Sequence, residues 1–118
     1  MQTRVLITDD RARSRSGMRA LLELQPEIVV VGEAADGREA VRLVEELQPD
    51  VVLMDVKMPV LDGLEATRRI KEEWPEVRVV VLTIHPGYRA EALAAGADAF
   101  LIKGCPARDL RKAIQVHE

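Results

Sequence analysis

Three aspartates, one threonine and one lysine are the residues of this sequence whose types best suit metal and phosphate chemistry. Asp9, Asp10, Asp55, Thr83 and Lys103 all lie at or just beyond the ends of short apolar runs. Crowded carboxylates repel one another and stay ionised only beside a cation, and few carboxylate ligands with retained water suit Mg²⁺. A lysine and a hydroxyl group nearby can hold phosphoryl oxygens while an aspartate acts as nucleophile. The residue types predict phosphoryl transfer to a carboxylate, provided that the fold brings them together.

The elements that must position these residues are five apolar runs, each followed by a segment with helical spacing. The runs contain few polar residues, as expected of strands buried on both faces of a parallel sheet. Repeated strand and helix units with right-handed crossovers then predict an α/β fold, a doubly wound (βα)5 sandwich around a five-stranded parallel sheet. The runs are residues 5–7, 28–31, 51–54, 79–82 and 100–102.

Helix boundary signals agree with this alternation. Asp36 followed by Glu39 is a variant of the capping box and predicts the start of the second helix, which Pro49 ends. Gly96 is placed to end the fourth helix, where Ala92 and Leu93 are the expected apolar contacts.

The five polar residues are predicted to converge because the carboxyl ends of parallel strands share one edge of the sheet. Ligands of open α/β sheets bind at that edge, where the strand order reverses. Taken singly, each residue has an ordinary structural interpretation as a turn, cap or surface residue. Those separate interpretations do not account for five such residues at one edge, so we favour a shared site.

Length and charge limit the classes of function. The 118 residues, 47% of them hydrophobic, suit one domain over residues 1–118, and a net charge of −3 argues against direct contact with nucleic acid. The apolar runs are too short to span a membrane. The single cysteine, Cys105, cannot form an internal disulfide, and the start of the chain lacks a signal-peptide pattern, so a cytoplasmic location is expected.

The motifs in their order resemble those of receiver domains of two-component response regulators. The matching stretches are VLITDD at 5–10, VLMDVKMP at 52–59, DGLE at 62–65, LT at 82–83 and LIK at 101–103. The resemblance implies the flavodoxin-like strand order 2-1-3-4-5, phosphorylation of Asp55 by a sensor histidine kinase, and Mg²⁺ as cofactor.

The same resemblance assigns roles to individual residues. It implies that Asp10, Asp55 and the backbone carbonyl of Lys57 bind Mg²⁺, that Asp9 acts mostly through water, and that Lys103 and Thr83 assist the transfer. It also implies that Thr83 and Phe100 form a switch pair which alters the surface around the fourth helix, the fifth strand and the fifth helix. A homodimer on phosphorylation fits this pattern. Self-phosphorylation and slow autodephosphorylation are the only reactions implied, so an enzyme is not expected.

The stretches VVVGEAADGREAVRL at 29–43 and GLEATRRI at 63–70 are most similar to regulators with a LuxR-type helix-turn-helix output domain. No such domain lies within this chain, so DNA binding and control of transcription would belong to residues beyond it. A stand-alone receiver that acts in phosphorelay or protein contacts is the alternative.

Two features depart from the family pattern. The segment IHPGYRAEAL at 84–93 is about two residues shorter than usual, which predicts a short fourth helix over about 89–95. Ile84 stands where a smaller residue is common, so we expect it to restrict access to Asp55.

Other classes of function fit these motifs less well. A haloacid-dehalogenase-type phosphatase would need an acid where Lys57 stands, and a flavin-binding module would need a glycine-rich loop where Asp9 and Asp10 stand. A degenerate receiver is disfavoured because all five site residues are present. The basic run Arg11, Arg13, Arg15 and Arg19 is interpreted as a solvated face, and His85 and His117 as loop and terminal residues.

Overall fold

The computed structural model describes residues 2–115, in which five strands alternate with five α-helices; His117 lies outside the described residues. The elements are β1 (Thr3–Thr8), α1 (Ala12–Glu23), β2 (Ile28–Ala34), α2 (Gly37–Leu47), β3 (Val51–Met54), α3 (Gly63–Glu73), β4 (Arg78–Thr83), the 3-10 helix η1 (Pro86–Tyr88), α4 (Arg89–Ala94), β5 (Ala99–Ile102) and α5 (Ala107–Ile114). Among the described residues, no helix is long and apolar enough to cross a membrane.

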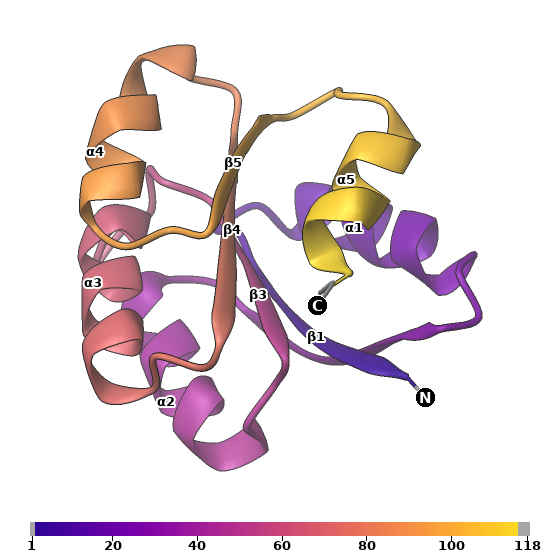
Figure 1. Cartoon of the computed structure of the whole chain (residues 1–118), viewed down its shortest axis with the longest axis horizontal. Helices are drawn as coiled ribbons and strands as arrows, with labels where there is room; N and C mark the ends of the chain where they lie inside the picture. Colours follow the sequence, from indigo (N-terminus) through magenta and orange to yellow (C-terminus); the bar gives the residue numbers. More distant parts are fainter. Residues whose placement is uncertain (1, 116–118) are drawn as a thin grey trace.

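The sheet is parallel throughout and has the strand order β2-β1-β3-β4-β5, as the sequence and its resemblance predict. Helices α1 and α5 cover one face, and α2, α3 and α4 cover the other (Figure 1). Each face has its own apolar core because strand side chains alternate between the two faces. Leu6 and Val52 belong to the core under α2 to α4, whereas Val5 and Leu53 belong to the core under α1 and α5.

Side-chain caps start helices α2 and α3. The Asp36 carboxylate accepts a hydrogen bond from the Glu39 amide at 2.8 Å, and Asp62 accepts one from the Glu65 amide at 2.9 Å. Helix α2 ends at the left-handed residue Gln48, directly before Pro49. These contacts confirm the predicted boundaries of α2.

Helix α4 has only six residues, follows η1, and is closed at its C-terminal end. The Ala97 amide donates to the Ala92 carbonyl and the Gly96 amide to the Leu93 carbonyl, both at 3.0 Å, with Gly96 at φ +105°. This is the Schellman arrangement, so the predicted role of Gly96 is confirmed. Leu93 was expected in the core but is 45% exposed, because Ala92 and the residue that follows the helix, Ala95, occupy the buried side.

The same end of α4 is tied to α3. The Lys71 ammonium donates to the Val77 carbonyl at 2.8 Å and to the Asp98 carboxylate at 2.8 Å. Asp98 also accepts from the Val79 amide at 2.8 Å, which joins the loop after α4 to the start of β4.

Candidate phosphoryl-transfer site

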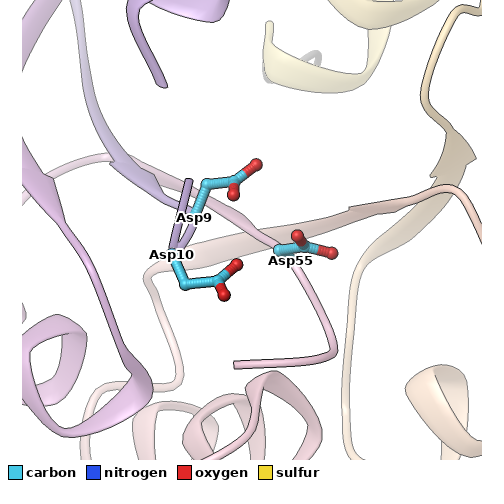
Figure 2. Close-up of side chains that lie close together, drawn as sticks. All are labelled: Asp9, Asp10 and Asp55. Atoms are coloured by element: carbon cyan, nitrogen blue, oxygen red, sulfur yellow. The ribbon is translucent and has the colours of Figure 1, made fainter. Parts of the chain in front are cut away.

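The three aspartates lie together where the strand order reverses, between β1 and β3. The Asp55 amide donates to the Thr8 carbonyl at 3.0 Å, which fixes the end of β3 beside the end of β1. One carboxylate oxygen from each of Asp9, Asp10 and Asp55 lies within 4.8 Å of the others. Figure 2 shows the three side chains extending from the adjacent strand ends. The predicted convergence of these carboxylates is therefore present.

Lys103 completes the cluster from the end of β5. Its ammonium donates to Asp9 Oδ2 at 2.7 Å and to Asp55 Oδ2 at 3.0 Å. Burial lowers the pKa of Lys103, but the hydrogen bonds to Asp9 and Asp55 outweigh burial and hold the pKa above its usual value. The lysine is therefore cationic and lies directly beside the Asp55 carboxylate.

Asp9 is the most fully hydrogen-bonded of the three carboxylates. Its Oδ1 accepts from the Arg11 amide at 2.9 Å, and its Oδ2 accepts from the Ser14 hydroxyl at 2.7 Å as well as from Lys103. Burial raises the pKa of Asp9, but these donors outweigh it and hold the pKa below its usual value. Asp9 is therefore ionised and held in place, whereas Asp10 is exposed.

Arg15 supports the turn that carries these aspartates. Its guanidinium donates to the Asp9 carbonyl at 2.7 Å and to Glu33 at 3.1 Å, and Arg19 donates to Glu33 at 2.6 Å. Both of these arginines of α1 thus pair with Glu33, and Arg15, whose side chain is 19% exposed, departs from the solvated face expected of the basic run. Ser14 could not be recognised from the sequence, since a hydroxyl five residues after Asp9 resembles any polar residue on a helix.

Thr83 and Phe100 lie on the neighbouring strands β4 and β5. Thr83 is fully buried at the end of β4, and its hydroxyl accepts from the His85 amide at 3.2 Å. Phe100 points inward, 9% exposed, with the Arg89 guanidinium 5.9 Å from the centre of its ring. Both predicted switch residues are therefore buried on neighbouring strands.

A pocket of about 90 Å³ opens beside the cluster. Ile84, which we expect to restrict access to Asp55, forms part of its wall and is 55% exposed. The lining residues are Asp10, Arg11, Asp55, Lys57, Ile84, His85 and Lys103. His85, interpreted from the sequence as a loop residue, is thus a wall residue of the site.

This geometry defines a class of protein: a doubly wound α/β domain with an acidic cluster and a lysine at its switch point. Residues 5–115 match the model of the response regulator receiver domain family. The chain is 41% identical to the transcriptional regulatory protein DegU of Brevibacillus brevis, over 95% of this chain and 48% of that protein. It is 40% identical to the response regulator protein VraR of Staphylococcus aureus, over 98% of this chain and 56% of that protein.

A solved structure agrees with these relatives. A LuxR-family two-component response regulator from Aurantimonas sp. SI85-9A1 superposes with a TM-score of 0.91 at 37% identity, covering 97% of this chain and 83% of that one. The chain belongs to the receiver domain family of two-component response regulators. It spans about half the length of the two curated relatives. Membership decides against the phosphatase and flavin-binding alternatives.

Proposed function

We propose that residues 1–118 form one receiver domain and that Asp55 accepts a phosphoryl group from a sensor histidine kinase. The observation that carries this proposal is the Lys103 ammonium, 3.0 Å from Asp55 Oδ2 in a site with two further carboxylates. A carboxylate oxygen of Asp55 attacks phosphorus, the bond from phosphorus to the donor nitrogen breaks, and the leaving imidazole keeps the electron pair and gains a proton. Lys103 then faces the new phosphoryl oxygens, and Thr83 supplies a hydroxyl donor.

Mg²⁺ is the proposed cofactor, held by Asp10, Asp55 and the backbone carbonyl of Lys57. The donor set fits, because Asp10, Asp55 and Lys57 line one pocket and carboxylate and carbonyl oxygens suit this ion. Asp9 already accepts hydrogen bonds on both oxygens, which suits an indirect role through water. When bound, Mg²⁺ would offset the negative charge that collects on the carboxylates and the phosphoryl group.

Phosphorylation is proposed to act through Thr83 and Phe100 on the surface around α4, β5 and α5. Phe100 packs in the same core as Ala92 of α4, and the Thr83 hydroxyl binds the His85 amide in the segment that leads to α4, so a change in either would alter how that helix is held. We further propose a homodimer on phosphorylation, a cytoplasmic location, and DNA binding through an output domain rather than through this chain. Self-phosphorylation from small donors and slow autodephosphorylation are the only reactions proposed. The stand-alone alternative would use the same surface for protein contacts.

Mass spectrometry after incubation with Mg²⁺ and phosphoramidate tests the phosphoacceptor. The parent chain should gain one phosphoryl group, Asp55→Asn should gain none, and the control Asp109→Asn on α5 should behave like the parent. Modification of the Asp55→Asn variant to the parent level would remove Asp55 from the proposed role.

Asp10→Ala tests the metal site. The variant should bind Mg²⁺ more weakly, and without metal it should be more stable by about 1 kcal/mol, the scale of one like-charge contact in water. Calorimetric titration and thermal melts in chelator measure the two effects. A lower melting temperature than the parent would contradict the expected relief of repulsion.

A further inference from the structure

Lys103 is shared between two carboxylates before any phosphoryl group is present. Its ammonium lies 2.7 Å from Asp9 Oδ2 and 3.0 Å from Asp55 Oδ2. A phosphoryl group on Asp55 would present several new anionic oxygens to this ammonium. Lys103 would then have to turn away from Asp9 in order to bind them.

The loss of the hydrogen bond from Lys103 would destabilise the Asp9 carboxylate if no other donor bound the same oxygen. Asp9 is 5% exposed, and a buried carboxylate that loses a hydrogen-bond donor is destabilised. The Ser14 hydroxyl prevents this loss, because it donates to the same Oδ2 at 2.7 Å. Ser14 also accepts a long hydrogen bond from Lys103 at 3.4 Å, so its hydroxyl lies next to both partners of the ion pair.

We propose that Ser14 is a positioning residue for phosphoryl transfer, whose hydroxyl holds Asp9 in place while Lys103 turns from Asp9 to the phosphoryl group. The inference rests on the proposed phosphorylation of Asp55. Ser14 is suited to this role by its place in the first turn of α1, where the backbone is fixed and the short side chain has few conformations. The Arg11 amide continues to donate to Oδ1 of Asp9, so each oxygen of the carboxylate retains a hydrogen-bond donor.

A purely structural role for Ser14 predicts a different result. A hydrogen bond that only fastened α1 to the strand end would change the melting temperature and leave the rate of phosphoryl transfer to the folded protein unchanged. Ser14→Thr and Ser14→Val form a matched pair, since one keeps a hydroxyl group where the other has a methyl group. Ser14→Ala removes the hydroxyl without added bulk and serves if the valine variant does not fold.

The experiment compares these variants in the full 118-residue chain. Four quantities are measured: the melting temperature, Mg²⁺ affinity, the affinity for beryllofluoride in Mg²⁺, and the phosphorylation rate with phosphoramidate at saturating Mg²⁺. We expect Ser14→Val and Ser14→Ala to bind beryllofluoride about tenfold more weakly and to react about tenfold more slowly, the effect of one hydrogen bond to a charged group. Ser14→Thr should match the parent in both.

Equal rates and beryllofluoride affinities for the threonine and valine variants would overturn the role of Ser14. The role of Ser14 would also be overturned if the phosphorylation rate of each variant fell only in proportion to the fraction of unfolded protein. If the parent chain gained no phosphoryl group on Asp55, the proposed function would fail and this inference with it. If the parent chain were phosphorylated on Asp55 and Ser14→Val reacted equally fast, the proposed function would stand and only the role of Ser14 would be refuted.

Discussion

Gly63 lies so close to Asp55 that a Cβ atom on Gly63 would stand 1.7 Å from the Asp55 carbonyl oxygen. The Gly63 amide also donates to the Val56 carbonyl at 2.8 Å, which seats the start of α3 on the loop that follows β3. The backbone that carries Asp55 is therefore shaped by contact with the first residue of α3.

Gly63→Ala should destabilise the domain by about 3 kcal/mol, because the added methyl group can be accommodated only by a shift of buried backbone. Urea denaturation measures the loss. The matched control is Gly17→Ala in α1, where a Cβ meets nothing within 4 Å. That substitution should stabilise the domain by about 0.5–1 kcal/mol through helix propensity. Similar effects of the two substitutions would show that the contact at Gly63 relaxes easily.

Val60 should be a source of strain in the loop between β3 and α3. Its φ is +71°, which β-branched residues rarely adopt, and the Leu61 amide donates to the Pro59 carbonyl at 2.7 Å across it. Val60→Gly should raise the free energy of unfolding by about 1 kcal/mol, as relief of the left-handed strain exceeds the entropy that glycine adds to the unfolded chain. Val60→Ala keeps a Cβ and should gain less. A glycine variant that unfolds at lower urea would contradict this account.

Glu33 should stabilise the domain at pH values above the usual pKa of glutamate, and this stabilisation should be lost in acid. The hydrogen bond from Arg19 lowers the pKa of Glu33 against the opposing effect of burial, and Arg15 lowers it further. A lowered carboxylate pKa means that stability is present above the unfolded value and is lost as the pH falls through the folded value. Glu33→Gln should cost about 0.5–1 kcal/mol at pH 7, and the difference should shrink as the pH falls through the lowered pKa of Glu33.

Chemical denaturation of parent and Glu33→Gln from neutral to acid pH measures this difference. The exposed Glu72→Gln on α3 serves as the charge-matched control and should follow the parent at every pH. A constant gap between the parent and Glu33→Gln across the range would indicate a packing effect instead of linkage to the carboxylate charge.

Residues 84–96 should exchange their amide hydrogens fastest among the helical segments. Helix α4 buries Ala92 and η1 buries no side chain, whereas α2 buries Ala40 and Val44 in the core. Short helices with little buried area open at low cost. Hydrogen exchange with and without beryllofluoride and Mg²⁺ should show the largest change here. Protection equal to that of α2, and unaltered by the mimic, would mean that this segment is rigid.

The sequence predicts the fold well because buried parallel strands leave a simple signal. The apolar runs mark all five strands, but β2 extends to Ala34, beyond the predicted end at residue 31. Gly32 and Glu33 break the apolar pattern there. They are tolerated because β2 is an edge strand of the sheet, where Glu33 meets the arginines of α1.

The site is predictable where it depends on strand ends and unpredictable where it depends on tertiary turns. Asp9, Asp10, Asp55 and Lys103 meet because parallel strands end at one edge, which the sequence pattern indicates. The contacts of Ser14 and Arg15 with Asp9 depend on how α1 leaves the strand, and no local pattern reveals that angle. Leu93 is exposed for a similar reason, since six helical residues do not show which side faces the sheet.

The two ends of α4 differ in how firmly they are held. The end at Gly96 is closed by the hydrogen bonds of Ala97 and bordered by the Lys71 and Asp98 pair, while the other end continues into η1 and the exposed Ile84. A force applied near Thr83 would therefore turn the helix about its Gly96 end and would not slide it along its axis. Displacement would be greatest at Arg89 and Tyr88 and smallest at Ala95, so α4 would rotate as a rigid body about its C-terminal end.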